Sequence, residues 1–141
     1  MHALTDWTCL TGAQLGRAFE AGSADPREVT EQYLEKIGAI DPDFAIYARL
    51  TADRARAEAE ASAARTKSGT RLSPLDGVPL SWKDLFDTAG VATESGTRLL
   101  AGRVPDTDAN VLVNATAAGT VCLGKTHQTE FAFSGLGVNP K

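Results

Sequence analysis

One lysine in this chain stands where a strand could present it for chemistry. The residues from Val78 to Lys83 alternate between apolar and polar types, which is the period of a half-buried strand. Among apolar neighbours an ammonium group loses hydration, and this loss favours the neutral amine that a general base requires. The pattern therefore predicts Lys83 as a candidate base. A lone lysine on a strand is nevertheless most often an exposed edge residue, so the prediction needs support from the surrounding sequence.

The surrounding sequence supplies a set of short motifs. They are Gly77-Val78-Pro79, Lys83-Asp84, Asp87-Thr88-Ala89-Gly90, Leu123-Gly124-Lys125-Thr126 and the run from Thr129 to Pro140. On these motifs, the stretch from Leu75 to Pro140 resembles the amidase signature family. The segments before residue 75 resemble the N-terminal helices of that family, so the resemblance covers nearly all of the chain.

The resemblance implies a chemistry for Lys83. In the family, the matching lysine belongs to a Ser-(cis)Ser-Lys triad that hydrolyses carboxylic amides, and its neutral amine draws a proton through the middle serine from the nucleophilic serine. Both serines lie in a glycine- and serine-rich segment beyond the part that matches Phe131 to Pro140. The 141 residues contain no Gly-Gly-Ser-Ser-Gly run. We therefore expect an amidohydrolase-family chain that holds only the lysine and is inactive alone.

The resemblance also implies a substrate-binding segment. In the family, the backbone and small side chains after the Glu-Phe-Ala match line the acyl pocket, which by position indicates Phe133, Ser134 and Gly135. An equally weighted alternative is a glycine-rich loop in which Phe131 and Phe133 are buried. Ser134 is not expected to be a nucleophile, because it lacks the Gly-x-Ser-x-Gly elbow and a histidine partner.

Composition and charge narrow the possible partners. The formal charge of −4 and the isoelectric point near 5.1 argue against a nucleic-acid partner. Cys9 and Cys122 form no CxxC pair and His2 and His127 stand alone, so we expect no metal and no other cofactor. No apolar run reaches a membrane-spanning length, and the first ten residues do not resemble a signal peptide. These features favour a cytoplasmic protein with no membrane partner, and the resemblance adds a small-molecule amide as the substrate.

Helix and strand signals along the chain predict an α/β order. Expected helices cover about 12–20, from 26 to just before Pro42, 52–67, and the residues that precede Gly119. Expected strands cover about 44–50, 76–83 and 120–124. The expected N-caps of the helices are Thr11, Asp25, Thr51 and either Thr107 or Asp108.

The resemblance extends this order to a fold. It implies the N-terminal portion of the amidase-signature fold, a mixed sheet covered by helices. We expect residues 1–141 to be an N-terminal fragment of that domain. A helical part would cover about 1–70, and the start of the catalytic core would cover about 71–141.

Two other hypotheses remain open. A truncated amidase-like chain could act as a binding or assembly protein with no catalysis, or a separate chain could supply the two serines. Strands cut from a larger sheet would leave unpaired edges, so self-association or a partner chain is also expected.

Overall fold

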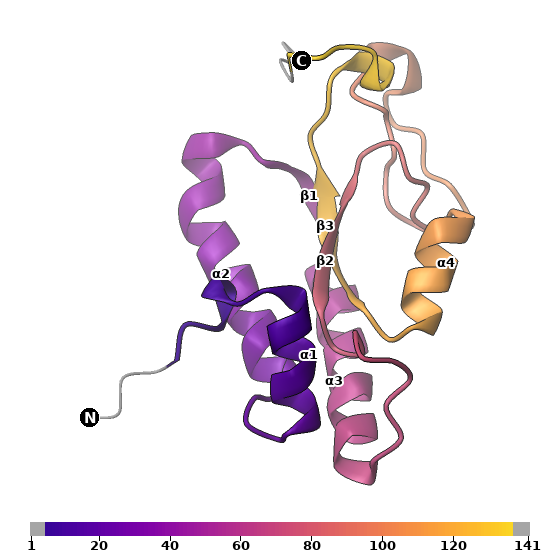
Figure 1. Ribbon diagram of the computed structural model, residues 1–141. Helices are drawn as coiled ribbons and strands as arrows, with labels where there is room; N and C mark the ends of the chain where they lie inside the picture. The colour runs from indigo at the N-terminus through magenta and orange to yellow at the C-terminus, as the bar shows by residue number, and fades with distance from the viewer. Residues whose placement is uncertain (1–4, 137–141) are drawn as a thin grey trace.

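A small mixed sheet lies at the centre of the computed structural model, which describes residues 5–136 (Figure 1). Its strands are β1 (Tyr47–Leu50), β2 (Pro79–Lys83) and β3 (Val121–Thr126), in the order β1-β3-β2. β1 runs antiparallel to β3, whereas β2 runs parallel to it. The expectation of an α/β fold with a mixed sheet is therefore confirmed.

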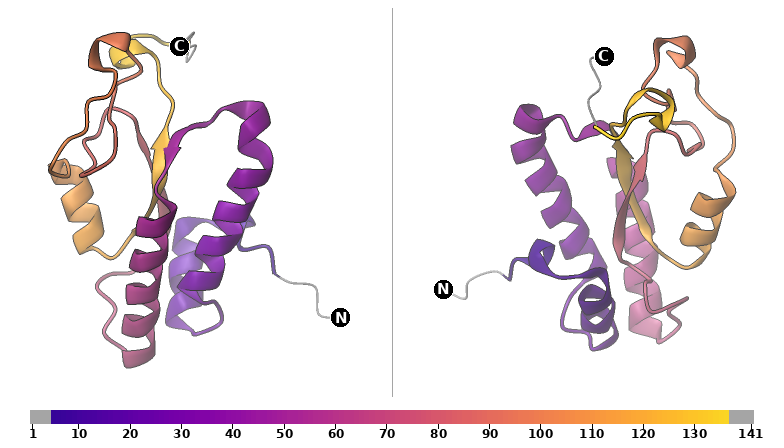
Figure 2. Two further views of the ribbon diagram at one scale, coloured as in Figure 1. Left: turned by 180° about the vertical axis from the view of Figure 1, so that it is seen from behind. Right: turned by 45° about the horizontal axis from the view of Figure 1, so that its top comes forward.

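Four α-helices accompany the sheet within residues 5–136. They are α1 (Gly12–Glu20), α2 (Pro26–Phe44), α3 (Ala52–Ser68) and α4 (Asn110–Ala117). Three single turns of 3₁₀ helix are η1 (Trp7–Cys9), η2 (Arg98–Leu100) and η3 (Glu130–Ala132). Helices α2 and α3 lie on one side of the sheet, and α4 lies on the other (Figure 1 and Figure 2). No helix among residues 5–136 is long and apolar enough to cross a membrane.

The first two helices begin at the predicted caps. The Thr11 hydroxyl accepts from the Gln14 amide while the Gln14 side chain accepts from the Thr11 amide, which completes a capping box. The Asp25 carboxylate accepts from the Arg27 amide at 2.8 Å, and Pro26 occupies the first helical position. These local signals predict the start of each helix correctly.

The end of α2 differs from the prediction. The helix runs through Pro42 to Phe44, so the strand begins at Tyr47 rather than near residue 44. Proline deprives the carbonyl four residues earlier of its helical partner, and here that residue is the exposed Gly38, whose carbonyl water can satisfy. Ala45, with a φ of 48°, then ends the helix in the left-handed conformation.

Thr51 is the N-cap residue of α3, as predicted, whereas the predicted cap of α4 is wrong because Ala109 holds that position. The Thr51 hydroxyl donates to the Cys122 carbonyl at 2.7 Å and makes no capping hydrogen bond to α3. The Asp108 carboxylate accepts two hydrogen bonds from Arg54 and one from the Ala89 amide, and α4 has no side-chain cap. Both side chains join segments that are distant in sequence, which a local pattern does not reveal.

Two apolar clusters hold the sheet and the helices together. The first joins α2 and α3 to β3 and consists of Leu34, Ile37, Ala55, Ala59, Val121 and Leu123. The second packs α1 and the start of α2 against the residue before β2 and consists of Leu15, Phe19, Ala24, Val29 and Val78. Burial of these side chains stabilises the packing of α1, α2 and α3 against the sheet.

Candidate active site

Lys83 lies at the carboxyl end of β2, beside the carboxyl end of β3. It pairs with Thr126 in the parallel register, and its Nζ donates to the His127 carbonyl at 3.1 Å. The His127 amide in turn donates to the Ile46 carbonyl at 2.8 Å. The amine is therefore directed toward a backbone whose position β1 and β3 define together.

The expected burial of Lys83 is not observed. Its side chain is exposed, and the aromatic contact of Trp82 is made with Phe86, at 5.5 Å between ring centroids. Alternation along the strand places Trp82 and Lys83 on opposite faces, so the apolar neighbours in the sequence do not surround the amine.

The fully buried lysine of this region is Lys125 in β3. Its Nζ donates to the Thr93 hydroxyl at 2.8 Å and lies 3.6 Å from the Asp84 carboxylate, and its side chain has no exposed surface. Burial lowers the pKa of Lys125, and the negative charge of Asp84 opposes that shift. The desolvation expected at Lys83 occurs at this second lysine instead.

Two further charged groups complete the arrangement around Asp84. Arg49 of β1 lies 3.4 Å from Asp84 and 2.6 Å from Glu94. We call Arg49, Asp84, Glu94 and Lys125 the charge cluster. Asp84 therefore pairs with cations of β1 and β3 and not with the adjacent Lys83.

The segment that contains the predicted substrate-binding residues follows β3. The Phe131 amide donates to the Ser95 carbonyl at 2.9 Å, and the Thr97 hydroxyl donates to Glu130 at 2.7 Å. Phe131 and Ala132 have φ values of 50° and 58°, which non-glycine residues seldom adopt. Residues 130–132 are therefore held against the loop 95–97 in an unusual backbone conformation.

Phe133, Ser134 and Gly135 are exposed at this end of the sheet. Phe133 is 93% exposed and Phe131 is 51% exposed, so the alternative in which both rings are buried is wrong. Because β2 and β3 are parallel, Lys83 and this segment emerge at the same end of the sheet (Figure 1). Lys83 and the described residues 133–135 thus lie at one end of the sheet, with no hydrogen bond or ion pair between them. Gly137 to Pro140 of the motif lie outside the described residues.

A hydroxyl pair lies on the face of β2 that carries Lys83. Ser81 is two residues before Lys83, and its Oγ is hydrogen-bonded to the Tyr47 hydroxyl of β1. The pair bridges across β3 at Gly124, whose position on the central strand leaves room for the Tyr47 ring. Burial raises the pKa of Tyr47, so this hydroxyl stays protonated at neutral pH.

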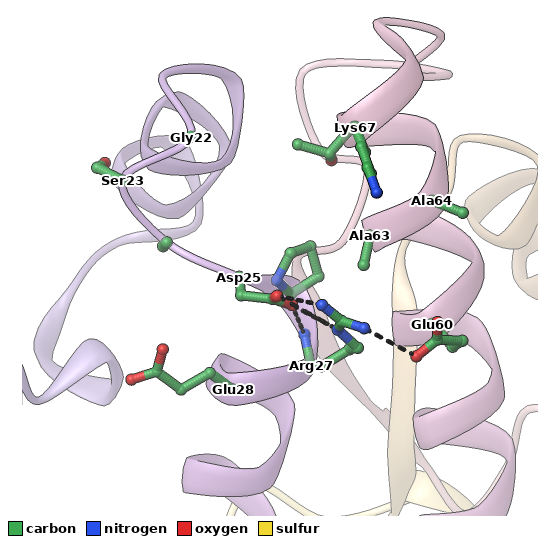
Figure 3. Close-up of a pocket in the computed structure, with 12 residues that line it drawn as sticks. Gly22, Ser23, Asp25, Arg27, Glu28, Glu60, Ala63, Ala64 and Lys67 are labelled. Carbon is green, nitrogen blue, oxygen red and sulfur yellow. Dashed lines mark hydrogen bonds and ion pairs between the residues drawn. The ribbon is translucent and has the colours of Figure 1, made fainter.

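A surface hollow of about 650 Å³ lies elsewhere, between α3 and the turn that precedes α2 (Figure 3). Its most prominent side chain, Arg27, is paired with Asp25 at 2.6 Å and with Glu60 at 3.5 Å. None of the motif residues lines it, so the hollow is separate from the Lys83 region. Within residues 5–136, no three His, Cys, Asp or Glu residues form a group that could hold a metal ion.

The charge cluster is not apparent from the amino-acid sequence. Its members come from a strand, a turn, a loop and another strand, and only Asp84 is adjacent to a predicted site residue. One signal in the sequence is Lys125, which directly follows the apolar run of a predicted strand. A lysine that is buried with such a strand needs a charged or polar partner, so its position indicates that partners lie nearby.

The chain matches a known protein family. A family model described as Amidase matches residues 28–141, a range that includes Lys83 and all of the predicted substrate-binding segment. The chain belongs to the amidase family. Among amidase-family relatives, a glutamyl-tRNA(Gln) amidotransferase subunit of Acidothermus cellulolyticus is 40% identical over 129 residues, which are 92% of this chain and 26% of that protein. The protein of the same name from Myxococcus xanthus is 43% identical over the same shares.

Solved amidase structures agree with this assignment. The peptide amidase from Stenotrophomonas maltophilia superposes with a TM-score of 0.78 at 34% identity, over 92% of this chain and 26% of that one. A chain from a vestigial protein complex, described for the origins of an s-triazine catabolic enzyme, gives 0.83 at 34% identity over 86% and 27%. The chain thus spans about a quarter of the length of the relatives it matches.

Proposed function

We propose that Lys83 is the general base of a carboxylic amide hydrolase of the Ser-cisSer-Lys type. The carrying observation is its position. The lysine of the Gly-Val-Pro…Lys-Asp motif ends β2, and its amine is directed to the carbonyl of His127 beside the segment that leads to Phe133. In this role the neutral amine takes the proton that the middle serine relays from the nucleophilic serine.

The same proposal assigns the acyl pocket wall to Phe133, Ser134 and Gly135. Their exposure at the end of the sheet that carries Lys83 leaves them accessible to a ligand. A large apolar ring such as Phe133, which is 93% exposed, suits contact with the acyl portion of an amide.

Two serines are still needed for this chemistry. The 141 residues contain no glycine- and serine-rich run that matches the family's nucleophile segment, so the chain alone is expected to release no ammonia from amides. Relatives include a chain from a protein complex and amidotransferase proteins that are themselves named as subunits. We therefore include an additional polypeptide segment, or a partner chain, in the functional unit.

A chimera tests the assignment of Lys83. This chain would replace the matching segment of the Stenotrophomonas maltophilia peptide amidase, and ammonia release from a peptide amide would be measured. Lys83→Ala and Lys83→Arg should each lower kcat/KM by about 10³-fold, because neither side chain can accept the proton. Lys67→Ala, at an exposed position on α3, is the matched control and should leave kcat/KM unchanged.

Two outcomes would contradict the proposal. One is a Lys83→Ala chimera that retains kcat/KM within a few-fold of the unsubstituted chimera. The other is a chimera that is folded by circular dichroism and yet releases no ammonia. Ammonia release by the 141-residue chain alone would instead show that the two serines are not required.

A further inference from the structure

Burying the charge cluster in the interior of a small protein has a large desolvation cost. The Lys125 side chain is fully buried and the Asp84 side chain is 5% exposed, while Glu94 and Arg49 are 14% and 28% exposed. Removing such groups from water costs more than their mutual attraction commonly returns, and well-packed apolar residues are often as stable in their place. Stability alone therefore does not account for these four residues.

Asp84 uses nearly all of its polar atoms to connect other segments. Its amide donates to the Thr126 carbonyl at 3.0 Å, and its carbonyl accepts from the Ser95 amide at 2.8 Å. Its carboxylate accepts from the Glu94 amide at 3.2 Å and faces Lys125 and Arg49. The residue that follows Lys83 is thus bound to β3 and to the loop 93–95.

The loop 93–95 carries the connection further. The Thr93 hydroxyl accepts from Lys125, and the Ser95 carbonyl accepts from the Phe131 amide. Ser95 itself has a φ of 51°, and it is bonded to Phe131, whose φ is 50°. Two residues with strained, positive φ angles are therefore joined by a hydrogen bond. Such strain persists only where the surrounding structure imposes it.

We propose that Lys125 is a positioning residue that, through Asp84 and the loop 93–95, fixes Lys83 relative to the segment 131–135. This role rests on the proposed function, in which Lys83 is the base and that segment is the acyl wall. Lys125 is the centre of the arrangement because its Nζ meets Asp84 after β2 and Thr93 in the loop, while its own backbone belongs to β3. The buried side chain of Lys125 therefore connects three segments: β3, the turn after β2 and the loop 93–95.

Two measurements on the 141-residue chain test the proposal without any amide hydrolysis. The first is competitive acetylation by acetic anhydride, with mass spectrometry giving the rate at Lys83 relative to the exposed Lys67. The second is hydrogen exchange at the Phe131 amide. Lys125→Met removes the charge and keeps the length of the side chain, so it should loosen both the Lys83–His127 contact and the Phe131–Ser95 contact.

In Lys125→Met, the relative acetylation rate of Lys83 and the exchange rate of the Phe131 amide should each rise about fivefold, as expected for the loss of one hydrogen bond. Val29→Ala is the matched control, because it removes buried apolar volume from the second apolar cluster, which contains none of the charge-cluster residues. It should lower the melting temperature and leave both rates unchanged in the folded state. This difference separates positioning from a general loss of stability.

Thr93→Val provides a second variant in case Lys125→Met does not fold. It removes the acceptor of the Lys125 hydrogen bond and keeps the side-chain shape, so both rates should rise by a smaller factor. If both rates stay within twofold of the unsubstituted chain in a folded variant, the proposal is wrong. That result would not affect the chimera test of Lys83 as the base. Conversely, a Lys83→Ala chimera with unchanged kcat/KM would contradict the base role of Lys83 and would not change the acetylation and exchange rates measured here.

Discussion

At the scale of single residues, Asp76 is the clearest case of a charge placed by its partners. Its side chain is fully buried, and Arg65 of α3 donates two hydrogen bonds to it at 2.8 Å and 2.7 Å. The Leu72 amide donates a third at 2.9 Å. Burial by itself would raise the pKa of Asp76, but these donors outweigh it and the pKa is lowered overall.

The stability of the chain should therefore depend on pH through Asp76. Because folding lowers its pKa below the ordinary value of 3.8, its contribution is complete above that value and is lost as the pH falls through the folded value. Asp76→Asn should lower the free energy of unfolding at pH 7 by about 2 kcal/mol and reduce the fall of this free energy as the pH drops below 3.8. Urea titrations at several pH values measure both effects.

A matched control for this prediction is Asp53→Asn. Asp53 is exposed on α3, and an exposed substitution should change the free energy of unfolding at pH 7 by less than about 0.5 kcal/mol. An Asp76→Asn variant with an unchanged acid transition would show that other carboxylates control the pH dependence.

At the scale of the elements, Gly124 allows β1 to approach the central strand. A Cβ at this position would lie 2.4 Å from the Arg49 carbonyl oxygen and 3.0 Å from the Leu50 Cα. Both contacts are with backbone atoms, which cannot move without disturbing the β1–β3 pairing. The register shift of β1 between Tyr47 and Arg49 occurs beside this position.

Gly124→Ala should therefore destabilise the chain by about 2–3 kcal/mol, because the added methyl group separates β1 from β3. Gly38→Ala is the opposite control. Gly38 lies in α2, and nothing within 4 Å would meet its Cβ. Alanine there should stabilise the chain by about 0.5–1 kcal/mol. Thermal or urea unfolding of the two variants gives the comparison, and equal effects would contradict the proposed close approach.

At the scale of the whole molecule, apolar side chains are exposed where the two turns η2 and η3 lie side by side (Figure 1 and Figure 2). Leu99 is 82% exposed, Phe133 is 93% exposed and Leu136 is 86% exposed. The described sheet also has two edge strands, β1 and β2, because β3 is the central strand. Both features favour association with another chain.

We predict that the 141-residue chain self-associates at micromolar concentration. The doubly substituted Leu99→Glu/Phe133→Glu chain should shift toward a monomer in light scattering, because charge opposes apolar contact at this surface. Thr107→Glu adds a negative charge at another exposed position and should not shift the distribution. A monodisperse monomer of the unsubstituted chain would contradict the prediction, because it would show that this apolar surface stays exposed to solvent without association.

Local patterns determined much of the architecture. The capping box at Thr11 and the Asp25-Pro26 start signal each act within one turn of helix, so the residues involved are neighbours in the sequence. Strand alternation likewise located β2, and the motif around Lys83 indicated the family. Each of these features depends only on residues that are close in the sequence, so the sequence alone specifies it.

Only the tertiary structure decided which lysine is buried. Val78, Leu80 and Trp82 predicted a dry environment for Lys83, but the burial of its side chain depends on which face of the sheet other segments cover. Lys125 is buried because Asp84 and Thr93, from two separate segments, both lie against its Nζ. The desolvation of a charge is a sum over all neighbours in space, and no window of sequence contains them.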